Sequence, residues 1–552
     1  TTGPYGTAQP IIEQLLGCRS CGEAPVPIES AGSVARGDLV RVSLTRPTER
    51  CAFHFRRRPF VLHKGSVWVS YFIVFVASAC TMTIELVAGR IMAPYIGVSL
   101  YTWTSIIGVV LAGMSLGNYL GGRIADRAPR PQTLGVLFLL SGLSSLSILA
   151  LVGFVGGRTI DLPVPLLAKI ALLTSLVFFL PSCLLGTISP VVVKLTLKDL
   201  QRTGSVVGKI YAWSTVGSIV GTFATGYWLI SWFGTRMIIA GVAVVVVIMG
   251  LVFGQLWKRE KVAVAGALLL VFFGFGYYLN TKNALQSPYW KESNYYSIRF
   301  FDQSDGEENG STVRVLVLDH LVHSYVSLDD PTRLDYAYEK VYADIVEYLS
   351  LTRPALNTLF IGGGGYTFPR YMEHVYPTSN LEVIEIDPEV TRVSYEELGL
   401  SRDSRIVTYN MDGRMFFSNG AAIRGKYDLI LGDAFNDLSI PYHLTTLEFS
   451  QKLMESLKPD GFFLANIIDN PKRGAFLRPY VNTLRRVFPH VTVAAMGRGW
   501  EASAQNTLIV VASMVPIDPD DFKATLTARR GGKEPATEIE RMIEKIKSDA
   551  DD

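Results

Sequence analysis

Cysteine is scarce in this chain of 552 residues. The five cysteines are Cys18, Cys21, Cys51, Cys80 and Cys183, and none lies in the C-terminal half, which excludes a disulfide framework there. The spacing of Cys18 and Cys21 suits half of a zinc or redox site, but no second pair follows. Two free thiols in a flexible segment are the alternative. Because no Cys/His cluster occurs elsewhere, we predict no metal.

Net charge is also small, at +3, and the sequence has no basic stripe with interleaved aromatic residues. Proteins that bind nucleic acid usually carry such a stripe, so we predict no nucleic-acid partner.

Charge is nearly absent from long stretches between residues 67 and 280. About 20 apolar residues cross the hydrocarbon core of a bilayer. The stretches long enough to do so are 67–88, 101–121, 132–155, 165–193, 210–231, 236–255 and 262–280. We therefore predict a transmembrane helical bundle of about seven spans over residues 65–281, with the lipid bilayer of the inner (plasma) membrane as its partner. Residues 1–64 are rich in Gly, Pro, Ser and Arg, show no signal-peptide cleavage pattern, and are expected to form a flexible basic leader.

Small residues recur at every fourth position in two of these spans. They are Gly113, Gly117 and Gly121 in one, and Gly217 and Gly221 in the other. This spacing places them on one helix face and predicts close helix packing in lipid. Pro181 and Pro190 are expected to kink the fourth span.

Glu85 is an ionisable residue near the end of the first span, five residues before Arg90. Such residues are costly at membrane depth and face a partner or a cavity. Pairing with Arg90 or another base, and a path for a cation or an amine, both stay open.

A glycine-rich turn between two apolar strands dominates the C-terminal half. Residues 359–361 are followed by Gly362, Gly363, Gly364 and Gly365, and a second apolar strand at 381–386 contains Glu385 and precedes Asp387. In open α/β sheets this pattern holds a nucleoside at the carboxyl ends of the strands, with the acid accepting the ribose hydroxyls. A tight turn that binds nothing is the alternative.

Alternating strands and helices surround this turn. We predict strands at 356–361, 381–386, 405–409, 427–433 and 461–468, each followed by a helix, and a closing pair at 491–495 and 508–512. This order predicts a seven-stranded Rossmann-like methyltransferase sheet over residues 351–515. A small β-hairpin region with strands at 295–301 and 312–318 and a helix at 340–350 is expected over 288–350. Residues 516–552 read as a charged, partly disordered tail.

Further acids follow the third and fourth strands, where a ligand on this sheet would lie. Asp412 and Gly413 can meet the adenine amine, and Asp433 can orient a nucleophilic amine and take its proton. An acidic rim also favours a cationic sulfonium. His443, before the next helix, can line the pocket. Helix capping is the alternative for Asp387 and Asp412.

At these residues the chain resembles the spermidine synthase family of aminopropyltransferases. Residues 289–298 (YWKESNYYSI) look like the family's opening strand and 317–320 (VLDH) like its Leu-Asp-Gly turn. Gly362, Gly363, Gly364, Glu385, Asp387, Asp412, Gly413 and Asp433 fall on the nucleoside and catalytic motifs. The apolar half is similar to the spans fused to such domains in bacterial proteins. The resemblance implies S-adenosylmethionine or its decarboxylated form as the bound substrate, with a small-molecule amine as acceptor.

The chain departs from the family pattern at several of these positions. Gly365 replaces an acid that holds the amine of decarboxylated S-adenosylmethionine, and Asn436 replaces a second acid, unless Asp437 takes its place. A family glutamine falls near His323, and Tyr336 and Tyr338 lie where the family has an acceptor-site tyrosine. Without these two carboxylates the site would bind two ammonium groups more weakly. It would also tolerate the carboxylate of intact S-adenosylmethionine.

We therefore expect a membrane enzyme that transfers an aminopropyl-type group to an amine, with Asp433 as the base. Methyl transfer or cleavage of S-adenosylmethionine on the same fold is one alternative, and a transporter with a nucleoside- or polyamine-sensing domain is another. A homodimer stays open.

The side of the membrane on which the domain lies is a point of conflict. Basic residues gather in alternate loops, namely Arg123, Arg127 and Arg130, then Lys194, Lys198, Arg202 and Lys209, then Lys258, Arg259 and Lys261. The positive-inside rule places these loops and the leader in the cytoplasm, so seven spans would put residues 281–552 outside. A nucleoside cofactor made in the cytosol instead requires a cytoplasmic domain, which is the arrangement we expect.

Overall fold

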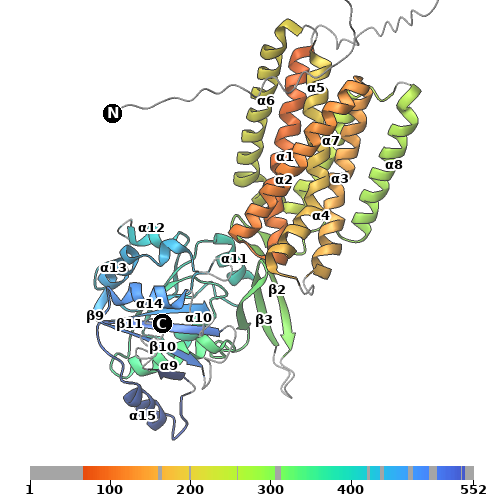
Figure 1. The fold of residues 1–552 in the computed structure, drawn as a ribbon. Helices are drawn as coiled ribbons and strands as arrows, with labels where there is room; N and C mark the ends of the chain where they lie inside the picture. The colour runs from red at the N-terminus through yellow and green to blue at the C-terminus, as the bar shows by residue number, and fades with distance from the viewer. Residues whose placement is uncertain are drawn as a thin grey trace, which may run out of the picture. The chain divides into compact units, whose positions relative to one another are not determined.

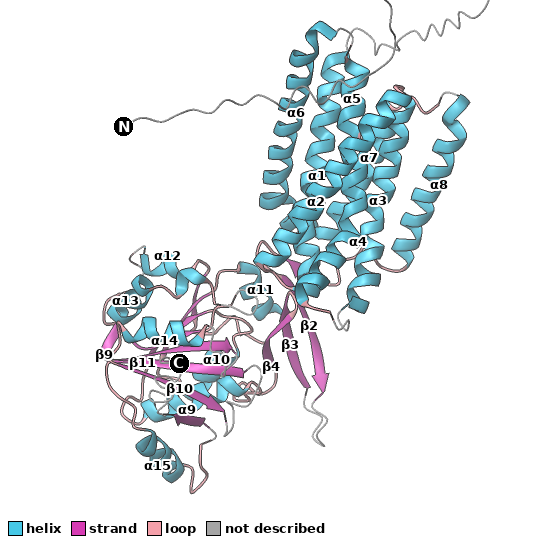
Figure 2. Ribbon diagram, in the orientation of Figure 1, coloured by secondary structure: helices cyan, strands magenta, loops and turns pink. Residues whose placement is uncertain are grey.

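The structure is a computed structural model, and it describes residues 66–540 apart from short gaps. The gaps are 160–163, 198–199, 258, 305–311, 419, 421–422, 436–439, 470–475, 497–505 and 536. An all-helical region comes first along the described chain, and strands with further helices follow it (Figures 1 and 2). The predicted leader, with Cys18 and Cys21, lies outside the described residues.

The helical region contains long apolar helices, as predicted. They are α1 (Ser66–Ile96), α2 (Leu100–Arg127), α3 (Pro131–Thr159), α4 (Leu166–Gly186), α5 (Ile188–Thr196), α6 (Thr203–Ala224), α7 (Ile230–Phe253) and α8 (Arg259–Thr281), with a short turn η1 (Leu200–Arg202) and a π-helical turn η2 (Thr225–Leu229). Within the described ranges, six stretches are long and apolar enough to cross a membrane.

One of these six stretches, Thr203–Phe253, has 51 residues. At a rise of 1.5 Å per residue it would be about 75 Å long as one helix, more than twice the roughly 30 Å of hydrocarbon it has to cross. Its backbone leaves the helical conformation at Gly234, where φ is 73°. The stretch is therefore long enough for two crossings, α6 and α7, which would make seven in all.

The repeated glycines lie where helices touch, which confirms the predicted packing seams. A Cβ on Gly117 of α2 would lie 2.1 Å from the Cys183 carbonyl oxygen of α4, and one on Gly217 of α6 would lie 2.2 Å from the Phe75 carbonyl oxygen of α1. Any larger residue would push these helix pairs apart.

The fourth apolar stretch is interrupted at Thr187, between α4 and α5. Pro190 has no N–H for the Gly186 carbonyl four residues earlier, and its ring crowds that carbonyl. This accounts for the break that the prolines predicted.

Polar contacts join the helices to the first strand residues. The Glu292 carboxylate accepts hydrogen bonds from the Thr235 backbone N–H (2.6 Å) and hydroxyl (3.2 Å), next to the kink at Gly234 inside α7. The Arg90 guanidinium of α1 donates to the carbonyl oxygens of Ser293 and Tyr295. Of the two roles predicted for Glu85, pairing with Arg90 is not seen among the ion pairs of the described residues.

A four-stranded antiparallel sheet follows, in the order β1 (Lys291–Glu292), β2 (Ser297–Ser304), β3 (Thr312–Leu318), β4 (Leu321–Ser327). The predicted hairpin corresponds to β2 and β3. The prediction missed β4, because residues 317–320 were read only as a turn. Asp319 has φ of 54°, so the chain reverses within two residues and pairs β4 directly with β3. Helix α9 (Ala337–Ser350) comes next and begins three residues earlier than predicted.

The main sheet confirms the predicted Rossmann-like arrangement of seven strands and adds an eighth. Its order is β12-β10-β11-β9-β8-β5-β6-β7. The strands are β5 (Asn357–Ile361), β6 (Asn380–Ile384), β7 (Val407–Tyr409), β8 (Tyr427–Gly432), β9 (Leu457–Asp469), β10 (His490–Met496), β11 (Asn506–Ser513) and β12 (Thr537–Glu540). Strands β5 to β9 pair in parallel, and β10, β11 and β12 are antiparallel to their neighbours.

Helices pack on both faces of this sheet because successive strand residues point to opposite sides. Ile361 of β5 joins a buried cluster with α12 (Gly413–Ser418), α13 (Leu447–Ser456) and α14 (Leu477–Arg485). Phe360, one residue earlier, joins the opposite cluster with α9, α10 (Thr367–Val375) and α15 (Pro519–Arg529). Helix α11 (Pro388–Glu396) follows β6.

Part of the predicted charged tail is ordered, over residues 516–535 and 537–540. Asp518 caps α15 through the backbone N–H of Asp520 (2.9 Å), and Phe522 and Leu526 are buried. Strand β12 then pairs with β10 at the sheet edge. Helix α15 was not predicted because its sequence is mostly charged. The charges lie on the exposed side of this short helix, and its two large apolar residues pack on α9 and the sheet.

Candidate active site

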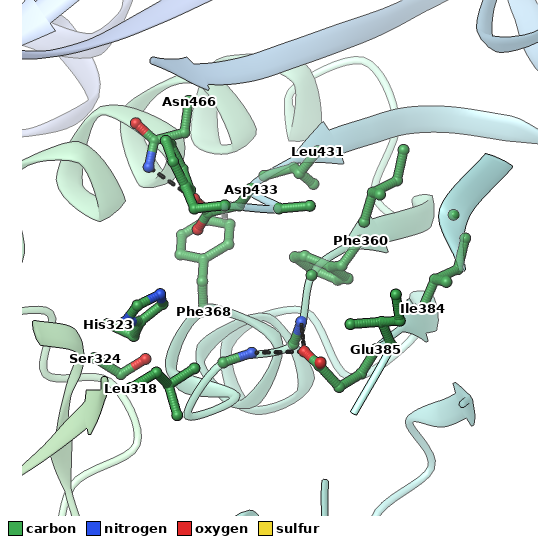
Figure 3. A pocket seen from close by; sticks show the side chains of 18 of the residues that line it. Leu318, His323, Ser324, Phe360, Phe368, Ile384, Glu385, Leu431, Asp433 and Asn466 are labelled. Atoms are coloured by element: carbon green, nitrogen blue, oxygen red, sulfur yellow. Dashed lines mark hydrogen bonds between the residues drawn. The ribbon is translucent and has the colours of Figure 1, made fainter. Parts of the chain in front are cut away.

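A cavity of about 390 Å³ opens at the carboxyl ends of the parallel strands. It lies where the strand order reverses between β5 and β8, the place where ligands bind in open α/β sheets. The glycine turn after β5, the ends of β6 and β8, the start of α9 and the β3–β4 hairpin contribute its walls (Figure 3).

The glycine turn approaches the end of β8 closely. Gly362 has φ of 107°, and a Cβ there would lie 2.5 Å from the Asp433 carbonyl oxygen, so only glycine fits. Gly362, Gly363 and Gly364 all line the cavity, as predicted for a nucleoside site.

Glu385 lies beside this turn with its carboxylate at the cavity wall (Figure 3). One oxygen accepts the N–H groups of Gly363 (2.8 Å) and Gly364 (3.3 Å), and the other accepts that of Asp387 (2.9 Å). Burial raises the pKa of Glu385, and these N–H donors oppose the rise. A carboxylate has about four acceptor positions, so one remains for a ribose hydroxyl.

Asp412 and His443 form a pair at the same wall. Asp412 caps α12 through the Met415 N–H (3.0 Å) with one oxygen, and its other oxygen lies 2.8 Å from His443 Nε2. Both residues and Gly413 line the cavity. Capping and a place in the cavity were predicted as alternatives for Asp412, and the structure combines them.

Asp433 lies at the end of β8, deep in the cavity (Figure 3). Its carboxylate accepts hydrogen bonds from the Tyr338 hydroxyl (2.9 Å) and the Asn466 side-chain amide (2.7 Å). Burial raises the pKa of Asp433 to about 6, although both hydrogen bonds favour the charged form. A carboxylate with this pKa is mostly ionised at neutral pH and more basic than an exposed one, which suits a general base.

His323 also reaches the cavity, from β4 (Figure 3). Its Nδ1 lies 3.1 Å from the Leu321 carbonyl oxygen, which fits an N–H at this nitrogen and a lone pair at Nε2. Burial lowers the pKa of His323 to about 4, so the ring is neutral at pH 7 and offers an acceptor to a ligand.

Two predicted cofactor residues do not line the cavity. Asp387 caps α11 through the Glu389 N–H (3.0 Å) and accepts a hydrogen bond from the Ser293 hydroxyl, so its carboxylate is used inside the protein. Gly365 donates its N–H to the Ser324 hydroxyl (2.8 Å) behind the glycine turn. Neither residue lines the cavity, so direct contact of either one with a nucleoside stays a prediction. Asn436 and Asp437 lie outside the described residues.

Several residues that line the cavity were not predicted from the sequence: Tyr296, Glu339, Tyr342 and Asn466. Asn466 had a usable signal, because it lies near the carboxyl end of β9, next to β8. Glu339 and Tyr342 had none, since they sit in the first turns of a helix with an ordinary amphipathic pattern.

The cavity is acidic. Among the described residues that line it, four are Asp or Glu and none is Lys or Arg. The backbone N–H groups of the glycine turn are engaged within the protein, including that of Gly362 with the Ile384 carbonyl oxygen (2.8 Å). Such a site attracts a cation and offers little to a ligand carboxylate. No group of three metal-ligating side chains occurs in the part of the chain that the structure describes.

Fold and cavity together define a class: a Rossmann-like domain with an acidic cavity at the switch point of its sheet, joined to a bundle of apolar helices. No family model matches the chain. Similarity to known proteins narrows the class. A probable polyamine aminopropyl transferase of Bifidobacterium longum is 31% identical over 145 residues, which is 25% of this chain and 31% of that protein. Polyamine aminopropyltransferase 1 of Streptomyces coelicolor is 25% identical over 427 residues, covering 72% of this chain and 75% of that protein.

Solved structures match parts of the chain as well. A probable spermidine synthase from Corynebacterium glutamicum has 25% identity and a TM-score of 0.40 over 45% of this chain and 88% of that chain. Human methyltransferase-like protein 13 in complex with SAH has 23% identity and a TM-score of 0.31 over 36% of this chain and 92% of that chain. In sequence, polyamine aminopropyltransferases match part of this chain, as the motifs indicated.

Proposed function

We propose that the protein is an integral membrane transferase that moves an aminopropyl group from decarboxylated S-adenosylmethionine to an amine and releases methylthioadenosine. The names of the relatives, polyamine aminopropyltransferases, support a transferase of this kind. The observation that carries the proposal is Asp433, a buried carboxylate with a raised pKa at the end of β8 in an acidic cavity.

In this reaction the neutral amine of the acceptor attacks the aminopropyl carbon bonded to the sulfonium. The new C–N bond forms as the C–S bond breaks. The electron pair of the C–S bond returns to sulfur, which becomes a neutral thioether. The attacking nitrogen then loses a proton, and Asp433 accepts it. Tyr338 and Asn466 hold the two oxygens of Asp433 and so fix the direction from which the amine approaches.

Glu385 is the proposed ribose acceptor, and the Asp412–His443 pair is the proposed contact of the adenine. The decarboxylated form of the cofactor is favoured over S-adenosylmethionine itself. A substrate carboxylate would find no Lys or Arg among the described lining residues and would face four acids.

The six apolar stretches support a location in a membrane, for which we propose the inner membrane with the domain in the cytoplasm, where the cofactor is made. If the chain crosses the membrane seven times, the basic loops instead predict that the domain lies outside the cytoplasm. A reporter fused after residue 515 tests this, and an external signal would contradict the cytoplasmic assignment.

Product analysis tests the reaction. The purified full-length protein is incubated with each form of the cofactor, with and without diamines, and the products are identified by mass spectrometry. Methylthioadenosine together with an aminopropylated amine supports the proposal. S-adenosylhomocysteine would show methyl transfer, methylthioadenosine without any amine would show a lyase, and no turnover would favour a transporter with a sensing domain.

A further inference from the structure

The start of α9 brings a second carboxylate into the cavity beside Asp433. Glu339 follows Tyr338 and is only 2% exposed. Its Oε2 is buried and has no hydrogen-bond partner within the described part of the chain. Burial of an unpaired carboxylate oxygen is costly, so this atom is a candidate for contact with a ligand.

Two further acceptor atoms in the same cavity are also buried and unpaired: the Tyr342 hydroxyl oxygen and Asn466 Oδ1. Asn466 uses its amide group on Asp433, which leaves its oxygen for another donor. A primary ammonium group carries three N–H donors and no acceptor, which matches a set of this kind.

Aromatic rings surround these atoms. The centroids of Tyr336 and Tyr338 are 5.1 Å apart, those of Tyr338 and Tyr342 are 5.5 Å apart, and those of Tyr342 and Phe368 are 5.3 Å apart. Aromatic faces attract cations and exclude water, so the rings strengthen the interaction of an ammonium group with a carboxylate.

We infer that Glu339 binds a primary ammonium group of a substrate and so supplies a carboxylate that the glycine turn lacks. This inference rests on the aminopropyl transfer proposed above. At Gly365 the chain has no acid and no room for one, because a Cβ would lie 2.7 Å from Ser324 Cβ and 2.8 Å from Val326 Cγ2. Two substrates carry such an ammonium group: the aminopropyl end of decarboxylated S-adenosylmethionine, and the second amine of a diamine acceptor.

A purely structural role is the competing explanation, because Glu339 is the third residue of α9. At this position a Glu or Gln side chain can accept the backbone N–H of the residue that precedes the helix, here Tyr336. A hydrogen bond from Tyr336 to Glu339 is present and opposes the rise in the pKa of Glu339 that burial and Asp433 cause. Glutamine preserves this cap with its one oxygen, but it removes the charge and places an NH2 donor where Oε2 was, so Glu339→Gln separates the two roles.

The test compares the full-length wild type with Glu339→Gln and with a matched control, Asp344→Asn. Asp344 is a buried acid of the same helix, but it bonds to Arg530 (2.6 Å) and the Thr537 hydroxyl (2.6 Å) and does not line the cavity. Each protein is titrated calorimetrically with decarboxylated S-adenosylmethionine and with methylthioadenosine, which is the same nucleoside without the ammonium group. The KM of a diamine acceptor is then measured.

If Glu339 holds the aminopropyl end, Glu339→Gln weakens binding of decarboxylated S-adenosylmethionine about ten- to a hundredfold. The Kd of methylthioadenosine then stays within about threefold of its wild-type value. If it holds the acceptor, the KM of the diamine rises by a similar factor while both titrations are unchanged. Asp344→Asn should change none of these values. Unchanged titrations and an unchanged KM in Glu339→Gln, or equal losses for both nucleosides, would overturn the inference. Since the wild type would still form aminopropylated product, that result would leave the proposed function intact.

Discussion

Replacement of Asp433 by asparagine should lower turnover, leave nucleoside affinity nearly unchanged and raise stability above pH 6. Asparagine has nearly the same shape and can still bond to Tyr338 and Asn466, but it cannot take a proton. General base catalysis contributes about 10²- to 10⁴-fold, so kcat should fall by that factor. The affinity for methylthioadenosine should stay within about threefold, because the nucleoside contacts proposed for Glu385 and Asp412 are untouched.

The pH dependence of the wild type follows from the raised pKa. Burial raises the pKa of Asp433 to about 6, so below pH 6 the carboxyl group is protonated and cannot accept a proton. We expect kcat/KM to rise through an inflection near pH 6, and Asp433→Asn should lack this inflection in its residual activity.

The same shift has a consequence for stability. In the unfolded chain an aspartate has a pKa of about 4, so between pH 4 and pH 6 the folded protein binds more protons than the unfolded one. Stability therefore falls as pH rises through this window, by about 3 kcal/mol for a rise of about two pKa units at this fully buried group. Asparagine carries no charge to bury, so the variant should gain stability relative to wild type above pH 6 and gain little at pH 4.

The assay is thermal unfolding of the full-length proteins in detergent at pH 4 to 8. The difference in Tm between Asp433→Asn and wild type should grow by several degrees across this range. The negative charge of Asp433 also raises the pKa of the neighbouring Glu339. Because Asp433→Asn removes that charge, this effect also increases the stability of the variant relative to wild type as pH rises. Unchanged turnover in the variant, or a Tm difference that does not depend on pH, would refute the assignment of Asp433 as a buried base.

Three other outcomes are expected. Glu385→Ala should weaken nucleoside binding by about 1–3 kcal/mol in a calorimetric titration, because a charge-assisted hydrogen bond is lost, and undiminished affinity would remove Glu385 from the site. Gly365→Asp restores the family's acid but should lower Tm and bind no tighter, because its Cβ would meet Ser324 and Val326 within 2.8 Å; tighter binding of decarboxylated S-adenosylmethionine would contradict this reading of the turn. Reporters fused before residue 66 and after residue 515 should lie on opposite sides of the membrane, and a result on the same side would refute two crossings by Thr203–Phe253.

Local patterns predicted much of the fold because they report local physics. Strand β3 was predicted with the bounds that the structure has, the strands from β5 to β11 were predicted within a few residues, and the helices between the parallel strands were predicted in order. Their periodicities are properties of short segments and hold whatever the rest of the chain does. Strand β12 and helix α15 were missed because their short apolar patterns become meaningful only against the sheet edge and α9.

In the candidate site, too, some residues could be predicted from the sequence and others could not. Acids that end parallel strands can be placed in one cavity from the sequence, since all such ends meet at one edge of the sheet; Glu385, Asp412 and Asp433 were found by this rule. The rule also selected Asp387, which the structure turns away from the cavity to cap α11. Glu385 and Asp387 are two positions apart in the sequence, and only the path of the backbone after β6 decides which one lines the cavity.

By itself the sequence determined that the chain has apolar helices, a glycine turn on a parallel sheet and a row of acids at the strand ends, because composition and periodicity act over short distances. Only the tertiary structure decided which polar groups have partners. Tyr338 and Asp433 are 95 positions apart, and Asn466 is 33 beyond Asp433, yet all three share hydrogen bonds. Glu339 lies in the same cavity with one oxygen unpaired. Burial and pairing depend on contacts between distant segments, so the raised pKa of Asp433 and the free oxygen of Glu339 exist only once the chain has folded.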